Sequence, residues 1–221
     1  MKRLAIIGGG SWGTALAIVL APRFPDVRMW VFEADLAARM AATRENDVFL
    51  PGFKLPENVG IETDLPCALA GAEIVLSVTP SHVTRAVYER MRPHLSPSML
   101  LVSATKGIEN GTLLRMTEVI REATGAGRVG ALSGPTFARE VARGEPTAVV
   151  VASEDSALGR AVQVAFSGPS LRVYTNSDTV GVELAAALKN VIALGAGVCA
   201  GLGLGNNTTA ALITRGLAEI T

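Results

Sequence analysis

Three glycines in the segment GGGSWGTALA have the spacing of a phosphate-binding loop. Gly8, Gly10 and Gly13 form the pattern G-x-G-x-x-G between an apolar run and a helix-forming run. In such a loop the first glycine permits a tight turn, the second lets the backbone approach a pyrophosphate, and the third allows close helix–strand packing. Free N–H groups at the helix N-terminus then face the phosphates. The sequence predicts a dinucleotide site, and a glycine turn without a ligand is the alternative.

Glu33 lies about 20 residues further on, at the end of the second predicted strand. A carboxylate at this place accepts hydrogen bonds from a ribose 2′-hydroxyl and repels a 2′-phosphate, so Glu33 favours NAD over NADP. An ordinary solvated charge is the alternative interpretation. Arg39 and Arg44 follow closely in the sequence, so the use of NADP stays open.

Two lysines lie where an amine could act on a substrate. Lys106 follows the fourth predicted strand, and ligands of open α/β sheets bind beyond the carboxyl ends of the strands. Lys189 lies in an apolar helical stretch, next to Leu188 and Ile192. Burial there is expected to lower the pKa of the amine and make it a usable general acid and base. A surface lysine and a snorkelling helix lysine are the respective alternatives.

The segment LSGPTFA offers a further group of polar atoms. A turn at Gly134 exposes backbone N–H groups and Thr136 adds a hydroxyl, although a simple strand-ending turn is the alternative. His82 and His94 each stand without a partner identifiable from the sequence, so neither is expected to be a catalytic base. No spacing typical of metal ligands occurs. The late GLGLG motif does not follow a strand, so we interpret it as a break between helices rather than a second phosphate cradle.

The elements that must position these residues alternate along most of the chain. Nearly continuous apolar runs are typical of strands covered on both faces. We expect strands at residues 4–7, 27–32, 73–78, 99–104, 128–135 and 147–153. Helices are expected at residues 14–20, 81–91 and 112–123. This repetition predicts an α/β fold with a Rossmann-type, doubly wound, mostly parallel sheet.

The pattern changes to long helices after about residue 178. We expect one helix over residues 179–201, capped by Ser177 or Asp178. A second helix follows the GLGLG break, with Asn206 or Asn207 as its cap. The sequence thus predicts a dinucleotide-binding domain over residues 1–178 and the beginning of an all-α domain, cut short, over residues 179–221.

Composition favours a soluble cytoplasmic protein. The 221 residues are 49% hydrophobic, which permits a sizeable core, and the formal net charge of zero argues against nucleic acid or a membrane surface as partner. Cys67 and Cys199 lie in apolar surroundings, which indicates a reducing compartment. The first apolar run is too short for a signal peptide, and the glycine-broken stretch 191–205 is too short for membrane insertion.

The chain resembles the N-terminal portion of bacterial-type NAD(P)-dependent glycerol-3-phosphate dehydrogenases over almost its whole length. The resemblance is carried, in the same order, by GGGSWGTALA, WVFEAD, FLPGFKLPENV, SVTPSHV, SATKGIE, LSGPTFAREVA and ELAAALKNVIALGAGVCAGLGLGNNTTAALITRGLAEI. WVFEAD is more similar to the NAD-specific eukaryotic branch. The resemblance implies reversible hydride transfer between a nicotinamide cofactor and dihydroxyacetone phosphate or sn-glycerol 3-phosphate, which supplies phospholipid synthesis. It is also consistent with a homodimer.

The resemblance also implies roles for individual residues. Lys189 matches the proton donor and acceptor, and Lys106 matches a lysine that contacts substrate and cofactor. The substrate side includes Gly134, Thr136 and Asn190. The cofactor side includes Gly8, Gly10, Ser11, Trp12, Gly13, Phe32, Glu33 and Ala138. The family's aspartate and its arginine–asparagine pair, which grips the substrate phosphate, have no match up to Thr221.

Two other functions stay open from the sequence. One is a non-catalytic nucleotide-binding or sensor domain. The other is a related dehydrogenase with another substrate, such as the 6-phosphogluconate and 3-hydroxyacyl dehydrogenases, which resemble this chain mainly at the glycine loop.

Overall fold

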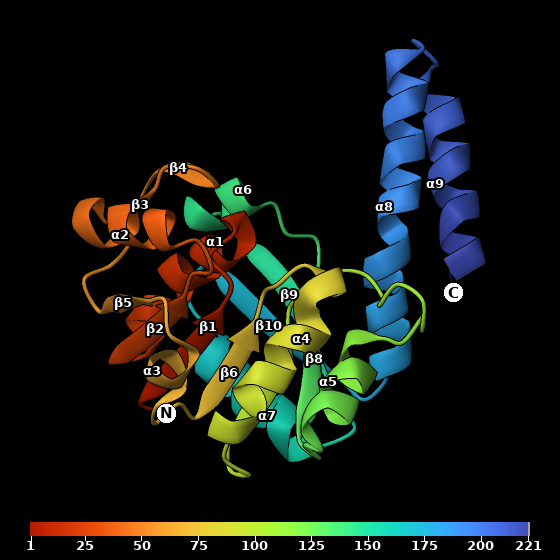
Figure 1. Cartoon of the computed structure of the whole chain (residues 1–221). Coiled ribbons are helices and arrows are strands. Elements are labelled where there is room, and N and C mark those ends of the chain that lie inside the picture. The colour runs from red at the N-terminus through yellow and green to blue at the C-terminus, as the bar shows by residue number, and fades with distance from the viewer. Residues whose placement is uncertain (221) are drawn as a thin grey trace.

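The computed structural model describes residues 1–220, which form a mixed sheet flanked by helices and a projecting pair of helices (Figure 1). The sheet has the strand order β10-β9-β8-β7-β6-β1-β2-β5, and only the β8–β9 contact is antiparallel. This arrangement confirms the predicted doubly wound, mostly parallel sheet. Its strands are β1 (Arg3–Ile7), β2 (Asp26–Trp30), β5 (Val59–Glu62), β6 (Ile74–Ser77), β7 (Leu100–Ser103), β8 (Val129–Ser133), β9 (Thr147–Ala152) and β10 (Leu171–Asn176).

Helices cover both faces of this sheet. They are α1 (Ser11–Leu20), α2 (Ala34–Thr43), α3 (Leu65–Leu69), α4 (Ser81–Met91), α5 (Met116–Thr124), α6 (Ala138–Ala142) and α7 (Ser156–Phe166). Short 3-10 turns follow α1 at Ala21–Arg23 (η1) and α4 at Arg92–His94 (η2). A small antiparallel hairpin of β3 (Glu45–Asn46) and β4 (Leu50–Lys54) lies outside the main sheet.

Strand β1 shows why the central strands are mostly apolar. Leu4 and Ile6 belong to the core on one face, with residues of α1, α2 and α7. Ala5 and Ile7 belong to the core on the other face, with residues of α3, α4 and α5. Side chains alternate between the two faces of a strand, so successive residues of a strand covered on both sides are buried and most of them are apolar.

The predicted elements are confirmed with shifted ends. Helix α1 begins at Ser11 rather than residue 14. Strand β2 ends at Trp30 rather than residue 32, and Glu33, expected at the end of this strand, is the N-cap of α2. The helix expected from residue 112 begins at Met116, because Leu113 has a φ of 60° and Arg115 forms a β-bridge with Ile108.

Several elements were not predicted, some of them short or at the edge of the sheet and two of them, α2 and α7, ordinary helices of 10 and 11 residues. The elements not predicted are α2, the β3–β4 hairpin, β5, α3, α6, α7 and β10. Strand β10 shows the reason, since only Leu171 and Val173 of its six residues are buried. An edge strand of this kind lacks the continuous apolar run that identifies a central strand.

Helices α8 (Thr179–Gly201) and α9 (Asn206–Ile220) form the projecting pair (Figure 1). The predicted cap Asp178 is confirmed, because its carboxylate accepts a hydrogen bond of 2.8 Å from the N–H of Gly181. The predicted asparagine cap of α9 is wrong. Asn206 is already helical, and the N–H of Thr209 donates to the carbonyl of Gly205.

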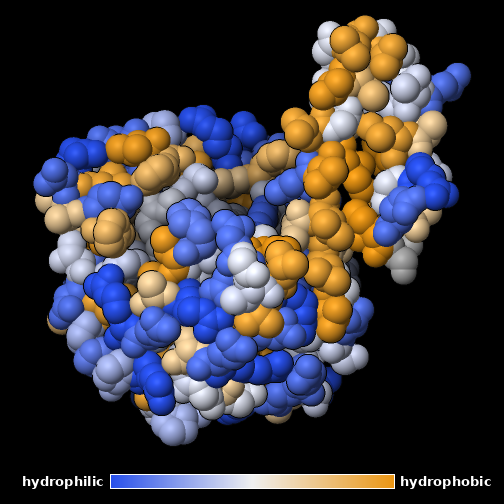
Figure 2. Space-filling model, turned by 45° about the vertical axis from the view of Figure 1, so that its right-hand side comes forward, coloured by the Kyte–Doolittle hydropathy of each residue, from blue (hydrophilic) through white to orange (hydrophobic). Residues whose placement is uncertain are grey.

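Apolar side chains cover much of the surface of these two helices (Figure 2). Helix α8 buries only Thr179, Glu183 and Ala186. By length and composition α8 is long and apolar enough to cross a membrane, with a mean hydropathy of 1.6. Residues 191–201 of the stretch that was expected to be too short for membrane insertion belong to this longer helix, and one such helix is by itself weak evidence of a membrane span. Cys67 is exposed beside Asp64 rather than in apolar surroundings.

The turn between β1 and α1 leaves no room for side chains at two glycines. A Cβ atom on Gly13 would lie 2.1 Å from the carbonyl oxygen of Gly8. Gly8 has a φ of 128°, and a Cβ there would lie 2.6 Å from the carbonyl oxygen of Val78. Strand β1, helix α1 and the end of β6 therefore approach one another through backbone atoms alone.

We predict that Gly13→Ala lowers the free energy of unfolding by at least about 2 kcal/mol, although alanine improves helix propensity by ~1 kcal/mol. The clash is with backbone, so no side chain can rotate away to relieve it. Urea denaturation followed by circular dichroism measures the change. Gly127→Ala is the matched control, because its Cβ would meet no atom within 4 Å. Equal midpoints for the two variants would contradict the prediction.

Candidate functional site

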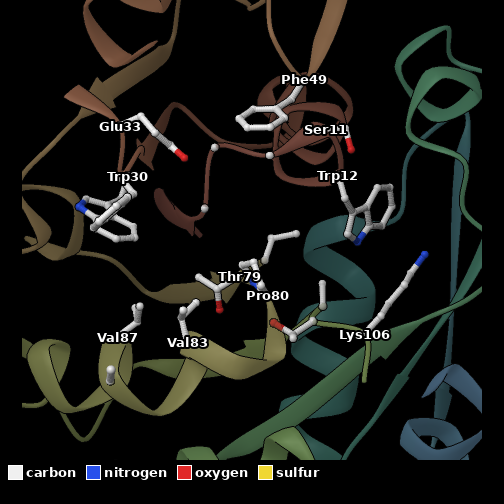
Figure 3. Close-up of a pocket in the computed structure, with 18 of the residues that line it drawn as sticks. Ser11, Trp12, Trp30, Glu33, Phe49, Thr79, Pro80, Val83, Val87 and Lys106 are labelled. Atoms are coloured by element: carbon white, nitrogen blue, oxygen red, sulfur yellow. The ribbon is translucent and has the colours of Figure 1, made fainter. Parts of the chain in front are cut away.

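A cavity of about 650 Å³ opens beyond the carboxyl ends of β1, β6 and β7 (Figure 3). Strand β1 lies between β2 and β6, so the chain leaves it on one side for β2 and later returns on the other side. Open α/β sheets bind ligands at this point of reversal. The glycine loop, the segment after β6 at Val78–Pro80 and Lys106 all line the cavity.

The glycine loop is open to the cavity at Gly10, although it packs closely against backbone at Gly8 and Gly13. Gly10 is the N-cap of α1, and a Cβ built there would meet nothing within 4 Å. The first N–H groups of a helix have no acceptor within the helix, and the helix dipole favours an anion beside them. The loop therefore fits the pyrophosphate of a dinucleotide, and Gly10, Ser11 and Trp12 are the residues that would hold it.

Asn46 holds the loop from behind, and the sequence analysis missed it. Its side chain is fully buried and donates to the carbonyl of Gly9 at 2.7 Å and to the hydroxyl of Thr14 at 2.8 Å. Its amide oxygen accepts from the N–H of Phe49 at 2.9 Å. A buried polar group with all these partners fixes the loop against the β3–β4 hairpin. In the sequence, Asn46 lies between predicted elements, and this position was the only available indication of a structural role.

The two ends of the cavity differ in chemistry. Glu33 and Trp30 lie at one end, Trp12 and Lys106 at the other, and the glycine loop lies between them (Figure 3). At the Glu33 end, the rings of Trp30 and Phe32 meet edge to face at 6.0 Å, and the guanidinium of Arg90 lies 5.7 Å from the Trp30 ring. An elongated ligand with a sugar hydroxyl near Glu33 would thus reach Lys106 with its far end.

The arginines considered for a 2′-phosphate point elsewhere. Arg39 donates to the carboxylate of Asp47 at 3.0 Å, and Arg44 donates to the carbonyl of Pro56. Neither lines the cavity, whereas Arg90 does.

Lys106 is the centre of a polar cluster at the far end. Its Nζ donates to the hydroxyl of Thr136 at 3.1 Å, and that hydroxyl donates to the carbonyl of Gly134 at 3.4 Å. The ammonium lies 5.8 Å from the centre of the Trp12 ring. Burial, together with the nearby charge of Lys189, lowers the pKa of Lys106 below its usual range. The charge of Lys189 is thus close enough to disfavour the ammonium form of Lys106.

The surroundings of Lys189 differ from the sequence expectation. Lys189 is half-buried, and its neighbour Leu188 is 45% exposed because α8 projects from the sheet domain. The buried helix face expected around Lys189 is therefore absent from residues 1–220.

The structure separates the predicted site residues into two groups. Those lining the cavity are Gly8, Gly10, Ser11, Trp12, Phe32, Glu33 and Lys106. Six other predicted residues lie outside the cavity. Gly13 packs behind the loop, and Gly134 and Thr136 lie beside Lys106. Lys189 and the exposed Asn190 belong to α8, and Ala138 begins α6. His82 and His94 are exposed and line no part of it. Residues 1–220 hold no group of three or more His, Cys, Asp or Glu side chains that could bind a metal ion.

Sheet topology and glycine loop together define a Rossmann-type dinucleotide-binding protein. Residues 3–159 match the family model described as NAD-dependent glycerol-3-phosphate dehydrogenase N-terminus, and residues 178–221 match the model of the C-terminus. The chain belongs to the NAD-dependent glycerol-3-phosphate dehydrogenases, a family of oxidoreductases.

Individual relatives agree with this assignment. Glycerol-3-phosphate dehydrogenase [NAD(P)+] of Koribacter versatilis is 57% identical over all of this chain and 67% of its own length. The enzyme of the same name from Geobacter metallireducens is 51% identical over 99% of this chain and 66% of its own length. The crystal structure of glycerol-3-phosphate dehydrogenase from Coxiella burnetii matches with a TM-score of 0.93 at 40% identity, covering 99% of this chain and 67% of that one. The chain thus spans about two-thirds of these relatives.

We predict that Lys106 loses its proton at a lower pH than the exposed lysines, and that Lys189→Met raises the Lys106 pKa. Burial and a like charge both disfavour the ammonium form, and the substitution removes only the charge. Dimethylation with ¹³C-formaldehyde makes each lysine visible to NMR, and a pH titration gives the pKa. Lys54→Met is the control, because Lys54 is exposed and pairs with Glu45 at 2.9 Å. An identical Lys106 titration in all forms would contradict the assigned cause.

Proposed function

We propose that the whole protein interconverts dihydroxyacetone phosphate and sn-glycerol 3-phosphate, with NAD(H) as the preferred cofactor. The observation that carries this proposal is a glycine-loop cavity that ends at Lys106, with Lys189 beside it. Membership in the family supports the reaction, and supply of glycerol 3-phosphate for phospholipid synthesis follows from it.

The cofactor residues lie in the order that a dinucleotide requires. Gly10, Ser11 and Trp12 would hold the pyrophosphate, Glu33 the ribose of the adenosine part, and the Trp30–Phe32 pair would adjoin the base. When bound near Lys106, the nicotinamide supplies a hydride in one direction and accepts one in the other. The polar atoms of the glycine loop and of Glu33 would orient the cofactor so that its nicotinamide reaches the Lys106 end of the cavity, where the substrate would bind beside it.

The two lysines would handle the charge and the proton. In ketone reduction, negative charge grows on the carbonyl oxygen, and an ammonium beside it stabilises that charge and donates a proton. In alcohol oxidation a neutral amine takes the proton back. We assign the proton to Lys189. We assign substrate orientation to Lys106 with Thr136 and Gly134, with Asn190 also on the substrate side and Ala138 on the cofactor side.

Other features of the whole protein are proposals from the sequence. We place the domain boundary between residues 178 and 179, where β10 has ended and α8 begins. A cytoplasmic location and a homodimer stay predictions.

Gly10→Val is expected to weaken NADH binding at least tenfold while the fold persists. The branched side chain would occupy the open space in which the phosphates approach the backbone. Fluorescence of Trp12 and Trp30, which both line the cavity, reports binding. Gly127→Val, in an open loop position, is the matched control. Equal NADH affinity in the two variants would mean that the phosphates bind elsewhere.

NAD(H) should bind at least as tightly as NADP(H). The carboxylate of Glu33 lines the cavity and repels a 2′-phosphate, whereas Arg39 and Arg44 are directed away from it. Parallel fluorescence titrations with both cofactors measure the ratio of dissociation constants. A clear preference for NADPH would refute the role of Glu33 and direct attention to Arg90.

For catalysis in the whole protein, Lys189→Ala and Lys189→Met should each lower kcat at least ~10²-fold, the scale for loss of a general acid. The affinity for NADH should stay nearly unchanged, since Lys189 does not line the cofactor cavity. Steady-state reduction of dihydroxyacetone phosphate measures kcat, with Lys54→Met as the control. Near-normal turnover by Lys189→Met would make the lysine structural and assign the proton to Lys106 or water.

A further inference from the structure

The buried residues of helix α8 all lie in its first two turns. Its buried residues Thr179, Glu183 and Ala186 are spaced by four and three positions, so they form one stripe. No residue of α8 after Ala186 is buried. Lys189 lies just past this stripe, and together with Glu183 it supplies the charged side chains of α8. The place of the Lys189 amine thus depends on how the stripe is docked.

Glu183 makes the polar contacts of this stripe with the sheet domain. Its carboxylate is 7% exposed and accepts from the N–H of Thr117 at 2.9 Å, from the Thr117 hydroxyl at 2.6 Å and from Arg115 Nη1 at 2.9 Å. Thr117 belongs to the first turn of α5, where the helix dipole favours a negative charge. Burial raises the pKa of Glu183, and the bonds from Thr117 and Arg115 oppose that rise.

The same turn of α5 also holds the segment that carries Lys106. Ile108, two residues after Lys106, forms a β-bridge with Arg115. The N–H of Glu109 donates to the carbonyl of Leu114 at 2.9 Å. Residues 114–117 therefore contact the Lys106 segment on one side and Glu183 of α8 on the other. Two lysines that are far apart in the sequence share one anchor.

We propose that Glu183 is a positioning residue that sets the distance between the Lys106 and Lys189 amines through the first turn of α5. This inference rests on the proposed function for its catalytic meaning. Lys189 is six positions after Glu183, which is ~9 Å along a helix. A tilt of about 10° at Glu183 would therefore displace Lys189 by roughly 1.5 Å, and a misplacement of ~1 Å can cost ~10²-fold in rate.

The test uses the chain itself, with ¹³C-dimethylated lysines and no substrate. Glu183→Ala is expected to shift the Lys106 pKa from its value in the unchanged chain, because Lys189 is displaced when α8 loses this anchor. Glu183→Gln is expected to leave it unchanged, since an amide keeps an acceptor for the Thr117 N–H. Thr117→Val, which removes one of the three bonds, is a milder variant should Glu183→Ala not fold. NADH affinity should not change in any of them.

Glu154→Ala is the matched control, because this exposed carboxylate also bonds α5, accepting a hydrogen bond of 3.2 Å from Arg121. A Lys106 titration in Glu183→Ala and Thr117→Val that coincides with the unchanged chain would overturn the proposal.

A kinetic measurement on the whole protein separates this inference from the proposed function. Glu183→Ala should lower kcat at least tenfold, leave KM for NADH unchanged, and be rescued by Glu183→Gln. If the unchanged protein does not reduce dihydroxyacetone phosphate while the lysine titrations respond as expected, the proposed function fails and the positioning role stands. If it reduces dihydroxyacetone phosphate and the titrations do not respond, only the positioning role fails.

Discussion

Close contact between backbone segments at the β1–α1 turn is the constraint on which the site depends. Gly13 approaches Gly8 and Gly8 approaches Val78 at distances that no side chain would permit. This contact brings the N-terminus of α1 to the switch point of the sheet, between β1 and β6. Backbone packing therefore determines that the N–H groups at the start of α1 face the cavity. A phosphate site of this kind needs no charged side chain, because aligned backbone dipoles supply the attraction.

Two buried polar side chains extend that constraint to the rest of the site. Asn46 ties the glycine loop to the β3–β4 hairpin, and Glu183 ties α8 to the first turn of α5. Each is almost fully removed from solvent, and each makes several hydrogen bonds. A buried polar group is costly without partners and specific with them, so these residues select one arrangement among the several that apolar packing alone would accept. Neither residue needs to touch a ligand to matter to the site.

The chemistry at the far end of the cavity is divided between two lysines in different surroundings. Lys106 is half-buried on the sheet domain, bonded to Thr136 and close to the Trp12 ring. Lys189 belongs to a helix whose outward apolar residues, such as Val191 and Leu194, are exposed at 69% and 72%. Desolvation, which shifts a lysine toward neutrality, therefore acts on Lys106 in the described part of the chain. A second cation nearby adds to that shift by repulsion.

The sequence by itself determined the central strands, the glycine loop and the helical character after residue 178. Continuous apolar runs and the G-x-G-x-x-G spacing are local signals that depend on few distant residues. The tertiary structure alone decided the edge strand β10, the hairpin that carries Asn46 and the role of Glu183. It also decided that Arg39 and Arg44 point away from the cavity and that Lys106 is the desolvated amine. Each of these depends on contacts between residues remote in the chain: Glu183 and Thr117, for example, are 66 positions apart. Local periodicity carries no information about such contacts, because burial and charge pairing arise only when the sheet brings the segments together.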